Sequence, residues 1–146
     1  MNEPLYGMAV LRLAAAVADH PPLNPADVAV EKRSVVCGSR VILTLRLDEQ
    51  AHATAVGIQA QACALGQAAA TVLARGIVGR SAEEVARVTA DWSDYLSGTA
   101  DEIPDWPDLA LLATGLNYPA RHASLRLAFE AASEAMALAL SESAKP

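Results

Sequence analysis

The stretch from residue 40 to residue 47, Arg-Val-Ile-Leu-Thr-Leu-Arg-Leu, decides the fold. Val41, Leu43, Leu45 and Leu47 alternate with positions that include two arginines and a threonine. This period of two is typical of a β-strand that buries one face and exposes the other. The stretch therefore predicts a half-buried strand in the first half of the chain.

Two further segments on either side of this strand follow the same alternating pattern. Residues 28–33 precede it, and residues 56–61 follow it after a short polar turn at 48–50. Consecutive strands joined by short connections usually pair with one another in antiparallel order. The sequence therefore predicts a three-stranded antiparallel meander.

The remaining segments have helical patterns. They cover residues 5–19, 64–75, 81–96, 108–114 and a long helix that starts at Asn117. Ser81 and Glu84 have the spacing of a capping box, which marks the start of the third of these helices. In the long helix, the following residues form an apolar stripe: Leu125, Phe129, Ala132, Met136 and Leu140. We expect an α+β domain of two layers, with the helices packed on one face of the sheet. It spans residues 1–146 as a single unit, with a core from about 5 to 141.

The composition limits the classes of function that the chain can have. The 146 residues carry a net charge of −6 without a dense Lys/Arg cluster, which argues against a nucleic-acid binder. No apolar segment is long enough to cross a bilayer, and the N-terminus lacks a basic region, so we expect a soluble, cytoplasmic protein. Two cysteines are too few for a multi-disulfide scaffold or a self-contained Cys₄ metal site. Common hydrolase and phosphate-loop motifs are absent, so classical enzyme chemistry is not expected.

The two cysteines lie at turns. Cys37 falls between the first two predicted strands, and Cys63 falls where the third strand gives way to a helix. In a meander these two places lie at the same end of the sheet, so the thiols can be close in space. The N-terminus of a helix also favours a thiolate, the form that binds metals and accepts sulfur. The alternative is that both cysteines are small hydrophobic residues of the core.

Four short motifs occur in a recognisable order. They are His20-x-x-x-Asn24-Pro25, Cys37-Gly38-Ser39-Arg40, Gln61-Ala62-Cys63-Ala64 and Tyr118-Pro119-Ala120-Arg121-His122-Ala123-Ser124. The series resembles the IscU/SufU/NifU-type iron–sulfur cluster scaffold family, nearest the zinc-containing SufU branch, from about residue 20 to residue 135. The resemblance implies the same α+β fold, and a metal or nascent cluster held by three cysteines and an aspartate.

The resemblance also implies where the ligands lie in this chain. Cys37 and Cys63 match two of the three cysteines, whereas the aspartate position is Ser39 and the third cysteine position is Ser124. A serine hydroxyl is a poor zinc ligand, so two thiolates should hold zinc or iron weakly. His122 becomes a candidate ligand if its helix starts at Ser124, and His20 is a comparable candidate. Arg121 is expected to line the site.

The function that the resemblance implies is that of a diverged iron–sulfur cluster assembly scaffold or sulfur acceptor. Its cofactor would be an iron–sulfur cluster, zinc or none, and its partners a cysteine desulfurase and other assembly factors, with persulfide sulfur transfer as its only enzyme-like step. A second copy of the chain would complete a labile cluster. Two alternatives remain: a non-metal interaction or regulatory protein of the same fold that docks to a desulfurase, and a thiol switch based on a Cys37–Cys63 disulfide.

Overall fold

The computed structural model describes residues 7–36 and 38–143, with side chains up to residue 141. Cys37 therefore lies outside the described residues. Within the described part of the chain, no helix is both long and apolar enough to span a membrane.

The three strands form the predicted meander. Strands β1 (Val28–Arg33), β2 (Arg40–Leu47) and β3 (Ala53–Gln61) pair in the order β1-β2-β3, and both pairs are antiparallel. Leu43 and Leu45 of β2 are fully buried, as the alternation predicts. Arg40 pairs with Gln61, so the start of β2 and the end of β3 meet at one end of the sheet.

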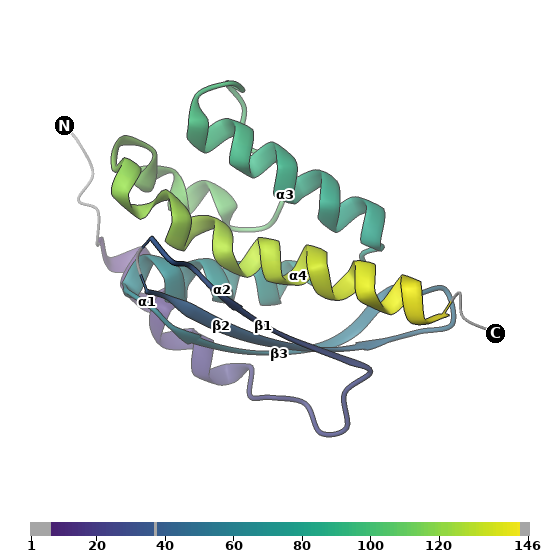
Figure 1. Ribbon diagram of the computed structural model, residues 1–146. Helices are drawn as coiled ribbons and strands as arrows, with labels where there is room; N and C mark the ends of the chain where they lie inside the picture. The colour runs from purple at the N-terminus through teal and green to yellow at the C-terminus, as the bar shows by residue number, and fades with distance from the viewer. Residues whose placement is uncertain (1–6, 37, 144–146) are drawn as a thin grey trace.

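Two helices cover one face of this sheet (Figure 1). They are α2 (Ala64–Ile77) and α4 (His122–Ser143). The centre of α2 is built from small side chains, and Ala68, Ala69 and Ala70 are all fully buried. Such short side chains let α2 pack closely between β3, α4 and the N-terminal helix α1 (Met8–Ala15). The small side chains of this helix therefore fit a position that is surrounded on several sides.

The helix α3 (Ala82–Ser97) corrects the expectation of two layers. It packs on the side of α4 that faces away from the sheet, and so it adds a third layer (Figure 1). Its buried Trp92 donates a hydrogen bond of 2.9 Å from the indole Nε1 to the carbonyl of Leu125. The capping box of Ser81 and Glu84 is present at its start, as predicted. The stripe of α4 is also correct except at its last member, because Leu140 is 47% exposed.

The segment before β1 crosses the other face of the sheet. The carbonyl of His20 accepts a hydrogen bond of 2.8 Å from the Ile58 amide, and Thr44 Oγ1 accepts one of 3.0 Å from the Leu23 amide. Gly57 lies beneath this segment, and any side chain there would collide with the backbone of Pro21. The crossing carries the chain from η1 (Ala16–Asp19), beside β3, to β1 at the opposite edge.

Two short 3-10 helices connect the outer layer to α4. They are η2 (Leu109–Asn117) and η3 (Pro119–Arg121). The loop before η2 is anchored by the buried Trp106, whose Nε1 donates a hydrogen bond of 2.8 Å to the Val72 carbonyl. The guanidinium of Arg80 lies 4.4 Å from the centre of the Trp106 ring. Trp92 and Trp106 are thus core anchors, as expected, while the acidic residues of the loop (Asp101, Glu102, Asp105 and Asp108) are exposed.

Candidate functional site

Ser39 and Ser124 meet at the end of the sheet where β2 begins. Their hydroxyl oxygens are 3.5 Å apart, although the residues are separated by 85 positions in the chain. Ser39 immediately precedes β2, and Ser124 lies in the first turn of α4. Both are buried, with 5% and 2% of their surface exposed. The structure therefore brings together Ser39, at the position of the family's aspartate ligand, and Ser124, at the position of its third cysteine ligand.

Cys63 lies at the same end of the sheet. It is the N-cap residue of α2, it is half-buried, and its thiol is free. Two residues before it, Gln61 pairs with Arg40, which follows Ser39. The first turn of α2 also packs against Ser124, because a Cβ placed on Gly66 would lie 3.6 Å from the Ser124 Cβ. Cys63, Ser39 and Ser124 therefore border one region, formed by β2, α2 and α4.

The turn between β1 and β2 adjoins this region through Ser39. The Ser34 amide donates a hydrogen bond of 2.9 Å to the Ser39 carbonyl, and the Gly38 amide donates one of 2.9 Å to the Ser34 carbonyl. Gly38 has a φ of 72°, a conformation that favours glycine. Cys37 belongs to this turn by sequence, but it is outside the described residues, so its proximity to Cys63 stays a prediction.

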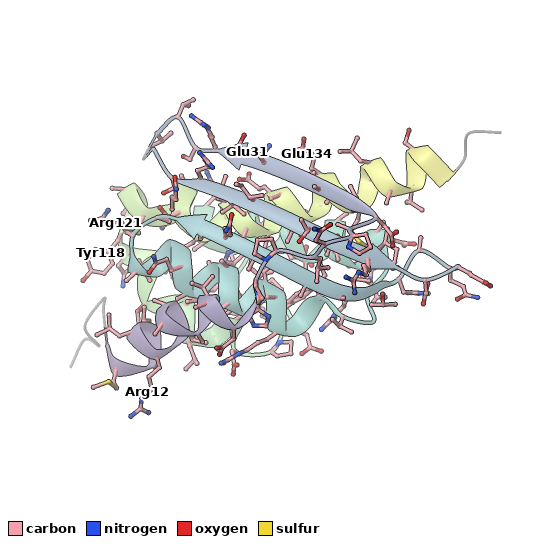
Figure 2. All side chains as sticks on the ribbon, turned by 90° about the horizontal axis from the view of Figure 1, so that it is seen from below. Arg12, Glu31, Tyr118, Arg121 and Glu134 are labelled. Atoms are coloured by element: carbon pink, nitrogen blue, oxygen red, sulfur yellow. The ribbon has the colours of Figure 1, made fainter. Side chains whose placement is uncertain are left out.

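Sequence reasoning missed the apolar tip of this turn. Val35 is 98% exposed and Val36 is 78% exposed. Two adjacent β-branched residues in a short turn, where polar residues and glycine are usual, were the available signal. Tyr118, at 42% exposed, lies with Arg121 at the same end of the molecule (Figure 2).

The histidine candidates lie elsewhere. The expectation for His122 required a helix that starts at Ser124, whereas α4 starts at His122. The His122 Nε2 is 2.9 Å from the carbonyl of Leu116, so the ring is hydrogen-bonded to the backbone of η2. The backbone of His20 is held at Ile58, about 10 Å along β3 from Gln61 at the usual rise per residue. Among the described residues, no group of three or more His, Cys, Asp or Glu side chains could hold a metal ion.

The distance between the two hydroxyls is compatible with a zinc site, but hydroxyl groups are weak zinc ligands. Neighbouring sulfur and oxygen ligands of a tetrahedral zinc ion lie about 3.6 Å apart, given the usual zinc–ligand distances. The Ser39 and Ser124 oxygens are 3.5 Å apart, a spacing near this value that is also that of two hydroxyls in hydrogen-bond contact. However, a neutral hydroxyl is a weak ligand and a good hydrogen-bond donor.

Comparisons with known proteins identify the family of this chain. The model of the NifU-like N terminal domain family matches residues 8–111, a range that includes Cys37, Ser39 and Cys63. The iron–sulfur cluster assembly scaffold protein IscU of Thermotoga maritima is 24% identical over 132 residues, covering 90% of this chain and 92% of that protein. The zinc-dependent sulfurtransferase SufU of Bacillus subtilis is 25% identical over 112 residues, covering 76% of each.

Solved structures show the same architecture. A crystal structure of the N-terminal part of a nitrogen-fixing NifU-like protein from Brucella abortus has a TM-score of 0.85 and 27% identity, and the match covers 96% of both chains. An iron–sulfur assembly scaffold of the SUF system from Fervidobacterium islandicum has a TM-score of 0.74 at 19% identity, covering 90% of this chain and 96% of that one. At that identity the second likeness shows the fold alone.

Proposed function

This chain belongs to the NifU-like N-terminal domain family, and from that premise we propose that it is a diverged iron–sulfur cluster assembly scaffold or sulfur acceptor. Its working thiols are Cys37 and Cys63. The observation that carries the proposal is the contact of Ser39 with Ser124 beside the first turn of α2. This contact brings together two of the four positions that the family resemblance assigns to ligands, and both of these positions carry hydroxyls.

The functions of the two relatives support the same chemistry. One is described as a cluster assembly scaffold, and the other as a zinc-dependent sulfurtransferase. Both functions use thiolates that bind iron or zinc, or that carry sulfur, so the cargo here is an iron–sulfur cluster, zinc or persulfide sulfur. A docking protein that has lost this chemistry is not favoured by the family or by these relatives.

The sulfur donor that we propose is the persulfide of a cysteine desulfurase. The thiolate of Cys37 or Cys63 attacks the outer sulfur of that persulfide, and the desulfurase cysteine leaves as a thiolate. Cys63 is the N-cap residue of α2, which places its thiol at the start of this helix. Free thiols persist in a reducing compartment, so we place this reaction in the cytoplasm.

Sulfur acceptance can be tested directly. The reduced protein is incubated anaerobically with a cysteine desulfurase and free cysteine, and its intact mass is measured. We expect a mass increase of one sulfur atom, which reductant removes. The Cys37→Ala/Cys63→Ala variant has no thiol and provides the blank, and each single variant identifies the acceptor.

Two results would decide against sulfur acceptance. A mass that does not change in the wild-type protein would exclude it, as would an equal increase in the variant without thiols. Counting free thiols before and after air oxidation tests the disulfide alternative in the same samples, because a switch requires both thiols to disappear together.

A further inference from the structure

A groove lies between α3 and the loop that follows this helix, in the outer layer of the molecule (Figure 1). Gly98 ends α3 in the left-handed conformation, and the loop then runs back along the helix until Trp106 meets Arg80, just before α3 starts. The space in the groove measures about 250 Å³. The outer layer therefore has a hollow with room for a side chain of a partner.

The two ends of the loop are held in place. The Trp106 indole donates a hydrogen bond of 2.8 Å to the backbone of α2, and the guanidinium of Arg80 lies 4.4 Å from the centre of its ring. At the other end, the Thr99 and Ala100 amides donate hydrogen bonds of 2.9 Å and 3.2 Å to the Asp94 carbonyl. The groove is therefore formed in the free protein, so a ligand does not have to order it on binding.

The lining of the groove combines apolar surface with two carboxylates. Val88 is 8% exposed and Pro104 is half-buried, whereas Asp91 and Asp105 are exposed. Within the described part of the chain, neither of these two carboxylates has an ion pair or a hydrogen bond. The groove therefore places unpaired negative charge beside an apolar surface.

The cations of the lining are already engaged. Arg80 donates a hydrogen bond of 3.0 Å to a backbone carbonyl of α2 and lies 3.9 Å from the Glu84 carboxylate. Arg87 lies 3.4 Å from the Glu83 carboxylate. Around the groove, residues 82–108 hold eight acidic residues and one arginine. The charge that remains for a ligand is therefore negative.

Apolar surface beside two carboxylates matches an arginine side chain. Its stem of methylene groups packs on apolar residues, while its charged head stays at the polar rim. The planar guanidinium has five N–H donors, which allows it to bind two carboxylates at once. A metal ion is a poorer match, because the described residues contain no group of three or more His, Cys, Asp or Glu side chains that could hold one.

We propose that this groove is a docking site for a basic segment of another protein, with an arginine as its anchor between Asp91 and Asp105. The acidic residues around the groove attract the rest of the segment and speed its approach. A second copy of this chain is a poor partner, because each copy has a net charge of −6 and no dense Lys/Arg cluster.

The docking site uses a different surface from the thiol of Cys63. Arg80 follows the C-terminal end of α2, whereas Cys63 precedes its N-terminal end, so about 20 Å of helix separates them. In addition, α4 lies between α3 and the sheet (Figure 1). The inference therefore does not depend on the sulfur chemistry proposed above.

The test is isothermal titration calorimetry of the full chain with a short synthetic peptide of alternating arginine and alanine, blocked at both ends. The control peptide carries citrulline in place of arginine, which keeps the shape of the side chain and removes its charge. We expect the arginine peptide to bind and the citrulline peptide not to bind. A wild-type protein that does not bind the arginine peptide, or that binds both peptides equally, would overturn the proposal.

Two charge-matched variants locate the binding. Asp91→Asn/Asp105→Asn removes both carboxylates of the groove, and we expect its Kd for the arginine peptide to rise roughly tenfold or more, because hydrogen bonds between charged groups are lost. Asp19→Asn/Glu49→Gln removes the same charge from exposed positions outside the outer layer and should bind as wild type does. An equal loss of affinity in both variants would overturn the proposal, because net charge alone would then explain the binding.

Two further measurements complete the test. Amide chemical shifts of the wild-type protein should change at Val88, Asp91 and Asp105 when the arginine peptide is added, and this decides the location if the groove variant does not fold. Changes confined to other surfaces would contradict the proposal. Persulfide acceptance by the folded groove variant should equal that of wild type. A wild-type protein that binds the peptide in the groove but accepts no sulfur would overturn the proposed function and leave the docking site intact.

Discussion

Restoring the two missing ligands should convert a weak metal site into a strong one. The change is Ser39→Asp with Ser124→Cys, at two positions whose side-chain oxygens are 3.5 Å apart. Structural zinc bound by four good ligands is worth about 10–16 kcal/mol. Two of the four ligands then contribute roughly half of that, about 5–8 kcal/mol, which corresponds to about four to six orders of magnitude in Kd. The calculation assumes that Cys37 and Cys63 supply the other two ligands.

The burial of these positions adds a second expectation. Ser39 and Ser124 are 5% and 2% exposed, so the new carboxylate is buried when no metal is bound. A buried polar group without its partner costs about 1–3 kcal/mol, and more when it is charged. The metal-free variant should therefore unfold at a lower temperature than wild type, and zinc should more than recover the loss by binding the folded state.

The assay is a competition titration against a chromophoric zinc chelator, under reducing conditions. Ser97→Cys is the matched control, because it adds a thiol at an exposed position at the end of α3 and should leave the affinity unchanged. A folded double variant that binds zinc no more tightly than wild type would show that Ser39 and Ser124 are not ligand positions. The placement of the whole site would then be wrong.

Two further predictions concern the helices that position the site. The backbone amide of Ser81 donates a hydrogen bond to the Glu84 carboxylate, and this bond lowers the pKa of Glu84. The ionised carboxylate therefore stabilises the folded state above the ordinary pKa of a glutamate. This stabilisation is lost as the pH falls through the lowered pKa. The difference in unfolding free energy between wild type and Glu84→Gln, measured with urea, should therefore shrink as the pH falls from about 7 to about 3, and a constant difference would contradict this. Gly76→Ala places a methyl group against the Trp106 indole, so we expect a loss of about 1–3 kcal/mol in thermal unfolding; unchanged stability would show that the indole can move aside.

The sheet was predictable because its alternation is local. Leu43 and Leu45 point to the core by period alone, and short connections leave the meander as the simplest topology. The position of Cys63 as the N-cap residue of a helix was predictable for the same reason, because an alternating segment changes there to an alanine-rich one. Local patterns thus place one of the two thiols at the end of the sheet.

The contacts between distant segments were harder to predict. The pattern of α3 shows that one face is buried but not which surface covers it, and the Trp92–Leu125 hydrogen bond that fixes α3 on α4 leaves no periodic signal. The N-terminal segment crosses the sheet through backbone hydrogen bonds, which leave no pattern of side chains. A glycine inside a strand, Gly57, was a signal in the sequence that another backbone approaches closely there. The pairing of Ser39 with Ser124 was suggested only by the family resemblance, since nothing in the periodicity links residues 85 positions apart.

The central claim is that two thiols at the end of this sheet are working ligands or acceptors in iron–sulfur cluster assembly. Iron and acid-labile sulfide content after anaerobic reconstitution, compared between wild type and Cys63→Ala, tests it most directly. We predict equal amounts of iron and sulfide in the wild-type protein, with sulfur-to-iron charge-transfer absorption, and the loss of both in the variant. Equal iron contents in the two proteins, or none in either, would contradict the claim.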